Sequence, residues 1–375
     1  MELALFFTRG VSLKTWIESG IFDREKLLYE EHLKRGNFKK IYWLTYGDDD
    51  RRLATELKKD GRLHNGIEVV PIPWFFTGRV GRFLYTFLMP IVHSGVFRRA
   101  DVYKTNQMDG SWTAVLAKWT FKKPLIVRTG FTASLFAKTN ARRIFYGIVE
   151  RFAYRWCDAG VVSSRKDRDY VISKNSRSAP GKIRLIYNYV DTNLFSPSCR
   201  DAVYVDRIVF VGRLTPQKNI PNLIAAMSGT DMTLDIYGAG EEETALKAHA
   251  KAMKARVNFM GVVPNAELPS VLSRYRYYVL PSRYEGMPKT LLEAMACGLV
   301  CIGTNVDGIN EVIEDDVTGF LARGTDSPEI LEAIMRAVNS DDKSISERAT
   351  QRILRDFSLE AFVEKELQIM ERFSA

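Results

Sequence analysis

The stretch Arg283-Tyr-Glu-Gly-Met-Pro-Lys-Thr-Leu-Leu-Glu293 determines how the second half of this chain is interpreted. Pro288 fits the first turn of a helix, and Met287 before it is a poor N-cap because it has no side-chain oxygen. Gly286 lets the backbone approach a ligand closely, and the open N–H groups of a helix start attract anions. The stretch therefore predicts an anion site, although a water-capped helix would fit the same residues.

Two carboxylates lie on either side of this predicted anion site. Glu285 is in the loop before the helix, and Glu293 lies inside the helix that Lys289 begins. We expect them to flank a phosphate-sized anion rather than to meet each other. Two solvated glutamates are the alternative that these residues leave open.

The size and composition of the chain indicate two folded domains. The chain has 375 residues, of which 46% are hydrophobic and 26% are charged, as in ordinary globular proteins. No apolar run is long enough to cross a membrane, and the opening Met1–Phe7 resembles a strand rather than a signal peptide. The four cysteines lack metal-ligand spacing, and four in a chain this long do not suggest a disulfide framework, so we expect a reducing cytoplasm. We expect no metal and no cofactor.

The net charge of +9 is divided unevenly along the chain. Residues 1–200 contain 35 basic and 19 acidic residues, whereas the remainder contains 19 basic and 26 acidic residues. A basic half joined to an acidic half predicts two surfaces with different partners. An anionic membrane surface or a phosphorylated acceptor would suit the basic half, and the chain shows no nucleic-acid-binding motif.

The first half alternates between strand and helix patterns, which predicts a mostly parallel α/β sheet. The predicted strands include Leu3–Phe7, Ile41–Thr45, Ile67–Val70, Leu125–Val127 and Gly160–Val162, with helices such as 23–35, 51–59, 113–119 and 142–156 between them. Ligands of such sheets bind at the carboxyl ends of the strands. Arg9-Gly10, Arg128-Thr129-Gly130 and Ser163-Ser164 follow predicted strands, so we expect them to point into one cleft.

Two segments of the first half each have two interpretations. Asp48-Asp49-Asp50 has the composition of a metal site, but it enters a helix, where N-capping acids are expected. Trp74–Arg99 combines aromatic residues with arginines and contains no acid. Such a segment suits an interfacial membrane contact, and a core helix with a basic exposed face is the alternative.

The second half contains a pair of cations after a predicted strand. Arg207–Val211 is the strand, and Gly212 begins a loop that carries Arg213 and Lys218. Arginine as a fork and lysine as a point charge suit a diphosphate, although solvated loops often carry both residues. The polar run 198–206 before this strand is the predicted linker.

At this point the motifs resemble those of a known family, the retaining glycosyltransferases of family 4. The similarity rests on Phe-Val-Gly-Arg-Leu-x-x-x-Lys-Asn at 210–219, on Tyr-Gly-x-Gly at 237–240, and on Glu-Gly-Met-Pro-x-x-x-x-Glu-Ala-Met-Ala-x-Gly at 285–298. It covers nearly the whole chain, strongly after residue 186 and loosely before it. The resemblance implies the GT-B fold, in which two Rossmann-like α/β domains face a central cleft.

The resemblance also implies domain bounds and residue roles. The N-terminal, acceptor-facing domain would span 1–200, the nucleotide-sugar domain 201–356, and a C-terminal helix, 357–375, would return toward the N-terminal domain. Arg213 and Lys218 would hold the diphosphate, and Glu285 would contact the donor sugar; these three are the expected catalytic residues. The remaining donor-site residues would be Gly212, Val263 beside the base, Gly286, Met287, Pro288, Lys289, Thr290, and Glu293 on the ribose.

The first domain supplies the acceptor-side candidates Arg9, Gly10, Ser12 and Arg128. Arg128 stands where many relatives carry a histidine, so the residue that faces the C6 region of the sugar differs. A subgroup of similar bacterial transferases shares Arg128 and the Ser12-Leu-Lys-x-Trp16 entrance.

The function that the resemblance implies is metal-independent, retaining transfer of a hexose from a UDP- or GDP-sugar. The acceptor would be a lipid-linked saccharide of O-antigen, capsule or exopolysaccharide synthesis, and the enzyme would sit peripherally on the inner face of the cell membrane. Two alternatives are a non-hydrolysing sugar-nucleotide epimerase of similar fold and a non-catalytic polyanion- or membrane-binding protein with a nucleotide-sugar pocket. The sequence leaves the donor, the acceptor, the linkage and the oligomeric state open.

Overall fold

The computed structural model describes residues 1–76, 78–130, 132, 134, 139–175, 181–197 and 204–373. The chain divides by its internal contacts into two compact units. Unit 1 comprises Met1–Ser163, Asp167–Ile186 and Val363–Ala375, and unit 2 comprises Ser164–Lys166 and Tyr187–Phe362. The expected domain boundary at residues 200 and 201 lies outside the described residues, as does Cys199.

Unit 1 is built on a seven-stranded sheet in the order β3-β2-β1-β4-β5-β6-β7, in which all pairings are parallel. The strands are β1 Glu2–Phe6, β2 Lys40–Leu44, β3 Ile67–Val70, β4 Val102–Thr105, β5 Leu125–Thr129, β6 Ala159–Val162 and β7 Ile183–Leu185. Because a parallel sheet is covered on both faces, its strands are almost wholly buried.

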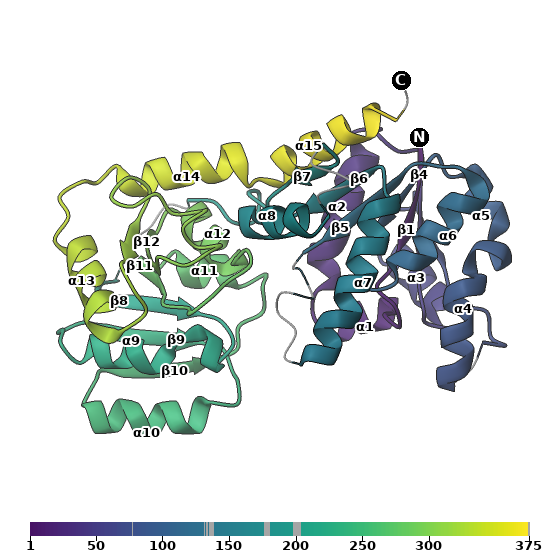
Figure 1. Cartoon of the computed structure of the whole chain (residues 1–375). Coiled ribbons are helices and arrows are strands. Elements are labelled where there is room, and N and C mark those ends of the chain that lie inside the picture. Colours follow the sequence, from purple (N-terminus) through teal and green to yellow (C-terminus); the bar gives the residue numbers. More distant parts are fainter. Residues whose placement is uncertain are drawn as a thin grey trace. The chain divides into compact units, whose positions relative to one another are not determined.

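The helices of unit 1 connect these strands and cover the sheet. They are α1 Leu13–Glu18, α2 Phe22–Lys34, α3 Asp50–Lys59, α4 Gly78–Val92, α5 Ser94–Arg99, α6 Ser111–Phe121, α7 Asn140–Trp156 and α8 Arg165–Lys174, whose first residues are in unit 2. Helices α4 to α7 contribute apolar side chains to the core that includes residues of the sheet. Figure 1 shows these helices in unit 1. No helix among the described residues is long and apolar enough to cross a bilayer.

Unit 2 has a six-stranded parallel sheet in the order β10-β9-β8-β11-β12-β13. The strands are β8 Tyr204–Val211, β9 Thr233–Tyr237, β10 Val257–Gly261, β11 Tyr275–Leu280, β12 Val300–Thr304 and β13 Phe320–Ala322. The helices are the 3₁₀ turn η1 Pro216–Lys218, α9 Ile220–Met227, α10 Glu243–Met253, α11 Leu268–Leu272, α12 Lys289–Ala296, α13 Ser327–Val338 and α14 Ile345–Asp356. Two parallel-sheet, Rossmann-like α/β domains therefore confirm the predicted fold class.

One local prediction is wrong, and one strand was not predicted. Residues 204–206 of the expected linker belong to β8, because Tyr204 pairs with β11 and its amide donates to the carbonyl of Arg274 at 2.7 Å; residues 198–203 lie outside the description. The sequence patterns also miss β4, the central neighbour of β1. The short segment Val102–Thr105 contains Lys104, a residue that is rarely buried.

Lys104 is buried because the C-terminal helix supplies its counter-ion. Helix α15, Leu359–Glu371, belongs to unit 1 from Val363 onward. Its Glu366 carboxylate lies 2.5 Å from Lys104 Nζ and 3.1 Å from His32 Nε2, and all three side chains are fully buried. Burial alone would raise the pKa of Glu366, but the charge of Lys104 and the hydrogen bond with His32 outweigh burial and lower it to about 2. The ion cluster thus fastens the end of the chain to β4 and α2.

Candidate functional site

The candidate site lies in unit 2, where the loops after the paired strands β8 and β11 meet. In these loops Lys218 Nζ lies 2.5 Å from Glu285 Oε1, and both side chains are nearly buried. The predicted roles place Lys218 on a diphosphate and Glu285 on a sugar, without a contact between them. The structure instead pairs the two residues directly, so in this state each neutralises the charge of the other.

Asn219 holds these two loops together. It adopts a left-handed conformation with φ of 56°, which asparagine tolerates better than most residues, and its side chain is fully buried. Its amide group donates to the carbonyl of Pro281 at 3.1 Å and to that of Thr325 at 2.7 Å, and its side-chain oxygen accepts from Arg283 Nε. The position of Lys218, one residue earlier, is therefore fixed relative to the loop that carries Glu285.

Two residues that the sequence motifs do not include hold the Glu285 carboxylate. The hydroxyl of Ser282, which is fully buried, donates to Glu285 Oε1 at 2.6 Å. Gln217 Nε2 donates to the carbonyl of Tyr284 at 2.9 Å and reaches Glu285 Oε2 at 3.4 Å. Ser282 lies three residues before Glu285, and this short spacing is the sequence signal for a hydrogen bond between the two side chains.

The start of helix α12 differs by one residue from the prediction. Pro288, with φ of −77° and ψ of 104°, is the N-cap rather than a residue of the first turn, and Met287 precedes it. The Pro288 carbonyl accepts the amides of Leu291 and Leu292 at 3.2 and 3.3 Å, as an N-cap carbonyl does. Proline has no side-chain acceptor, so the helix still begins without a side-chain cap.

Glycines bring the loops of the site close together. A Cβ atom at Gly238 would lie 1.9 Å from the carbonyl oxygen of Gly212, and one at Gly240 would lie 2.2 Å from that of Leu214. Gly238 and Gly240 therefore allow two loops to pack closely. This packing alone accounts for the two glycines, and no bound phosphate is needed to explain them. Gly286 is different, because a Cβ atom there would meet nothing within 4 Å.

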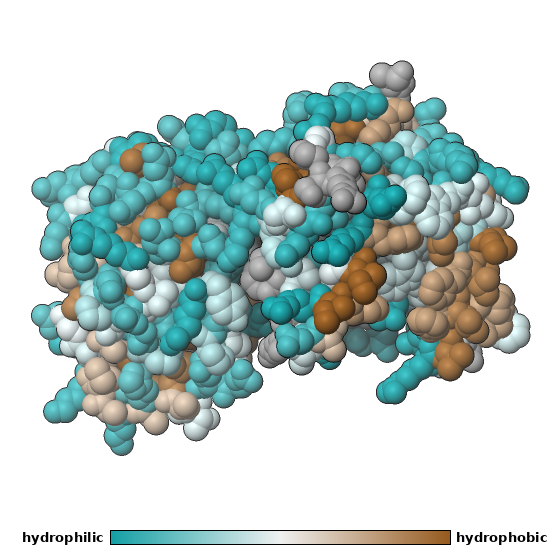
Figure 2. Space-filling view, viewed as in Figure 1, coloured by the Kyte–Doolittle hydropathy of each residue, from teal (hydrophilic) through white to brown (hydrophobic). Residues whose placement is uncertain are grey.

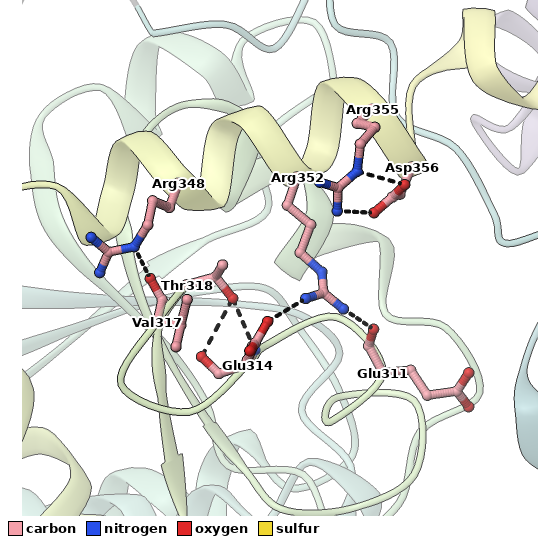
Figure 3. A network of polar contacts seen from close by, with 8 residues as sticks. All are labelled: Glu311, Glu314, Val317, Thr318, Arg348, Arg352, Arg355 and Asp356. Atoms are coloured by element: carbon pink, nitrogen blue, oxygen red, sulfur yellow. Dashed lines mark hydrogen bonds and ion pairs between the residues drawn. The ribbon is translucent and has the colours of Figure 1, made fainter.

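A second loop supports the backbone at Gly286. Gly308 has φ of +83°, and a Cβ atom there would lie 2.2 Å from the Gly286 carbonyl oxygen. Helix α14 stabilises the continuation of this loop. Arg352 donates to Glu314 Oε2 at 3.2 Å and to the carbonyl of Glu311 at 3.1 Å, and Arg348 donates to the carbonyl of Val317 at 2.7 Å (Figure 3).

The structure places the other predicted donor-site residues in unit 2. Arg213 is exposed and has no ion pair with a described residue, so it does not share Glu285 with Lys218. Glu293 is buried in α12, and Thr290 accepts a hydrogen bond at 2.8 Å from the hydroxyl of Tyr278. Burial raises the pKa of Tyr278, so this hydroxyl stays protonated and can donate. Val263 is half-buried in the loop after β10.

A further predicted donor-site residue, Gly212, lies beside the lysine of the pair. A Cβ atom at Gly212 would be 3.7 Å from Lys218 Cε. The ammonium group of Lys289 lies 5.5 Å from the centre of the Tyr189 ring.

The acceptor-side candidates lie in unit 1. Arg9 Nε is 3.5 Å from Asp109 Oδ1, and its guanidinium lies 5.4 Å from the centre of the Trp112 ring. Gly10 has φ of +75°, and a Cβ atom there would meet nothing within 4 Å. Arg128 is buried, and its amide donates to Thr105 Oγ1 at 3.0 Å.

Two polar residues, Ser12 and Asp50, stabilise the start of helix α1 in unit 1. The Ser12 hydroxyl accepts from the amide of Thr15 and forms a capping box at the start of α1. Asp50 does not cap its own helix. Its buried carboxylate accepts the amides of Leu13 at 2.8 Å and Lys14 at 3.4 Å, so it stabilises the N-terminus of α1. The acid expected to cap a helix therefore caps a neighbouring one.

Comparisons with known proteins identify the class of protein to which this chain belongs. The family model described as Glycosyltransferase Family 4 matches residues 30–194, and the model described as Glycosyl transferases group 1 matches residues 205–352. The chain belongs to the family 4 glycosyltransferases with the GT-B fold, which confirms the resemblance seen in the motifs.

Individual relatives support the same family. The chain is 29% identical over 268 residues to a UDP-Gal:alpha-D-GlcNAc-diphosphoundecaprenol alpha-1,3-galactosyltransferase of Escherichia coli, covering 64% of this chain and 67% of that protein. It is 28% identical over 256 residues to an alpha-maltose-1-phosphate synthase of Mycolicibacterium smegmatis, covering 60% and 66%. The matches thus span about two thirds of the length of each of these relatives.

Solved structures show the same fold over the whole chain. Anabaena HepE in complex with UDP has a TM-score of 0.77 at 17% identity and covers 99% of this chain and 100% of that chain. The sucrose-phosphate synthase of Thermosynechococcus elongatus has a TM-score of 0.72 at 18% identity, covering 99% and 98%. At these identities the likeness shows the fold.

Proposed function

We propose that this protein is a retaining glycosyltransferase that moves a hexose from a UDP- or GDP-sugar to a lipid-linked saccharide of surface-polysaccharide synthesis. The observation that supports this most directly is the Lys218–Glu285 pair at the carboxyl ends of β8 and β11. A nearly buried cation that contacts Glu285, in the loop that leads to the uncapped start of α12, suits a diphosphate, and a fixed carboxylate suits the hydroxyl groups of a sugar.

In the proposed reaction the diphosphate displaces Glu285 as the partner of Lys218. Arg213, which is exposed, would swing onto the same diphosphate, and the N–H groups of the first turn of α12 would face it. Glu285, still held by Ser282, would then accept from the donor sugar. The released lysine charge is thereby directed to the leaving group, where negative charge develops in the transition state.

The bond changes of the proposed transfer need no separate base. The bond between the anomeric carbon and the phosphate oxygen breaks, and its electron pair goes to the diphosphate. The acceptor hydroxyl oxygen bonds to the same face of the anomeric carbon and gives its proton to the leaving phosphate oxygen. We propose that Lys218, Arg213 and the helix start stabilise this diphosphate without a metal ion.

The name of the E. coli relative supports the choice of substrates. That protein is named for a UDP-Gal donor and for an acceptor carried on diphosphoundecaprenol. We therefore expect UDP-hexose to be the first donor to test on this chain, with GDP-hexose as the alternative, and we expect a polyprenol-linked saccharide as the acceptor.

Helix α4 provides the proposed membrane-contact surface. One side of the helix is buried in the core of unit 1 through Tyr85 and Met89. The other side is exposed and apolar rather than only basic, with Phe83, Phe87 and Ile91 among its exposed residues. Figure 2 shows this apolar surface over α4. Arg79 and Arg82 lie on the same helix, so the composition fits an anionic lipid surface.

The test is an acceptor-dependent transfer assay read by NMR. Purified protein is incubated with a UDP- or GDP-hexose, with and without a polyprenol-linked saccharide, and the anomeric signal of the product is followed. Retention requires a product with the same anomeric configuration as the donor. Donor interconversion without acceptor would instead reveal an epimerase, and an inverted product would contradict the retaining mechanism. Flotation with vesicles that contain phosphatidylglycerol tests the membrane contact separately.

A further inference from the structure

A pocket of about 520 Å³ lies in unit 1 between helices α7 and α8. Its volume is within the range of sites that bind small molecules. Hydroxyl groups line part of it, because Ser134 Oγ and Tyr170 Oη lie 3.2 Å apart there. The glycosyl-transfer proposal uses none of these residues, so the pocket requires a separate explanation.

The charges of this pocket favour an anion. Arg143 and Arg151 on α7 and Lys174 on α8 line it, all three are exposed, and none forms an ion pair with a described carboxylate. Glu150 is the one carboxylate among the lining residues. It is buried, and both of its oxygens already accept hydrogen bonds from Ser134, one from the amide at 3.0 Å and one from the hydroxyl. Three cations therefore face a single carboxylate whose oxygens are already hydrogen-bonded.

The mouth of the pocket is apolar and unusually exposed. Ile144 and Ile148, one helical turn apart, line the pocket and are 63% and 62% exposed, and Phe145 beside them is 49% exposed. Figure 2 shows brown, apolar surface over α7 and over α4 on the same face of unit 1. Exposure of large apolar side chains to water is unfavourable, and transfer into an apolar phase would lower their free energy.

We propose that this pocket binds the phosphate group of an anionic membrane lipid while Ile144, Phe145 and Ile148 enter the interfacial layer. A lipid headgroup places a phosphate directly beside acyl chains, and the pocket places its cations directly beside exposed isoleucines. A soluble phosphate would leave the isoleucines in water, and an apolar protein partner would leave three cations without counter-charge. The proposal rests on the membrane contact proposed for unit 1 and is independent of the transfer chemistry.

The test compares two triple variants of the full-length protein that lose the same number of positive charges. Arg143→Ala/Arg151→Ala/Lys174→Ala removes the cations of the pocket. Lys34→Ala/Lys39→Ala/Lys59→Ala removes exposed lysines elsewhere on unit 1. Binding is measured by flotation with phosphatidylcholine vesicles that either contain or lack phosphatidylglycerol, and thermal unfolding checks that both variants are folded.

The pocket variant should bind the anionic vesicles about 100-fold more weakly than the wild type, from about fivefold per basic residue near an anionic surface. The control variant should lose less than fivefold. Ile144→Ser/Ile148→Ser should weaken binding to the same vesicles while keeping every charge. An equal loss in the two charge variants would overturn the pocket as a site, because surface charge alone would then explain binding.

Two further outcomes separate this inference from the membrane contact of α4. If Phe83→Ser/Phe87→Ser abolishes flotation while the pocket variant floats like the wild type, the membrane contact stands and the pocket inference is wrong. If inorganic phosphate binds the wild type but not the pocket variant, and both float equally, the pocket serves a free phosphate and the inference is also wrong. A wild type that binds no anionic vesicle at low salt would overturn both proposals.

Discussion

The two units each contain a lysine–glutamate pair with the same separation, and the difference between them concerns what surrounds each pair. Lys104 and Glu366 in unit 1 lie 2.5 Å apart and are fully buried. Lys218 and Glu285 in unit 2 also lie 2.5 Å apart, but their side chains retain 12% and 8% exposure. The distance alone therefore does not show whether a pair is structural or functional.

The structural pair and the proposed functional pair differ in the secondary structure that carries them. Lys104 comes from a central strand and Glu366 from a helix, and the ammonium group also lies 5.1 Å from the centre of the Tyr29 ring. Lys218 and Glu285 come from loops at the carboxyl ends of strands, where ligands of α/β sheets bind. A fully buried pair between rigid elements cannot exchange partners without unfolding, whereas a pair in loops at a strand edge can.

The largest expected effect is on stability, from Glu366→Gln. This variant leaves Lys104 buried without its counter-ion, so we expect the free energy of unfolding to fall by about 3–5 kcal/mol. Urea denaturation at neutral pH measures the change. Catalytic turnover below the unfolding transition should remain near that of the wild type, because the cluster lies outside the candidate site.

A double variant and a pH series provide the controls. Lys104→Met/Glu366→Leu replaces both ions and should recover most of the lost stability, since matched apolar replacements of buried pairs are often neutral. The pKa of Glu366 is about 2, below its ordinary value of 4.5. Its contribution, about 3 kcal/mol by linkage, is therefore complete above pH 4.5 and is lost as the pH falls toward 2. A stability gap between wild type and Glu366→Gln that stayed constant over that range would contradict the assignment.

The next effect is on turnover, from Lys218→Ala. Removing a cation that stabilises the leaving diphosphate should lower turnover by about 10²–10³, as for other charge-stabilising donors. Arg213→Ala should lower it by a similar factor without a cost in stability, because Arg213 is exposed. Initial rates at saturating donor provide the measurement, with urea denaturation as the check on folding. Full turnover in both variants would show that the diphosphate binds elsewhere.

The same comparison shows which features could be predicted from the sequence. Lys218 and Glu285 lie in motifs whose spacing is local, Lys218-Asn219 after one strand and Glu285-x7-Glu293 after another, so both residues are recognisable. Their direct contact is not, because it depends on the adjacency of β8 and β11 in the sheet and on the fully buried Asn219.

The unit 1 pair lacks any local signal. Lys104 interrupts the apolar pattern of β4, and its partner Glu366 lies near the other end of the chain, so neither residue predicts the other. Alternation of strands and helices still gave the fold class, because hydrophobic periodicity is set within each element. The position of the Asp50 carboxylate at the start of α1 and the burial of Lys104 both depend on tertiary neighbours. The residue pattern within one element does not encode such neighbours.

A smaller effect is expected from Ser282→Ala. The hydroxyl of Ser282 orients the Glu285 carboxylate, and a hydrogen bond to a charged group contributes about 1.5–3 kcal/mol, so turnover should fall at least about tenfold. The affinity for UDP alone should change little, because Lys218 and the helix start remain. Isothermal titration with UDP and steady-state kinetics measure the two quantities, and Ser270→Ala, at an exposed position of α11, is the matched control. Equal losses in UDP affinity and turnover would indicate general disorder of the loop instead.

The smallest effects are expected from substitutions of two glycines. One substitution should lower stability, and the other should leave stability unchanged and weaken donor binding. Gly308→Ala places a Cβ atom at positive φ and 2.2 Å from the Gly286 carbonyl, so it should cost at least about 1–2 kcal/mol of stability. Gly286→Ala meets no protein atom within 4 Å, so unfolding should change by less than about 0.5 kcal/mol. If the donor approaches the backbone at Gly286, its KM should nevertheless rise severalfold in that variant. A Gly286→Ala protein with wild-type stability and wild-type KM would show that the open space at Gly286 is not the path of the donor, and the proposed position of the diphosphate would have to move along α12.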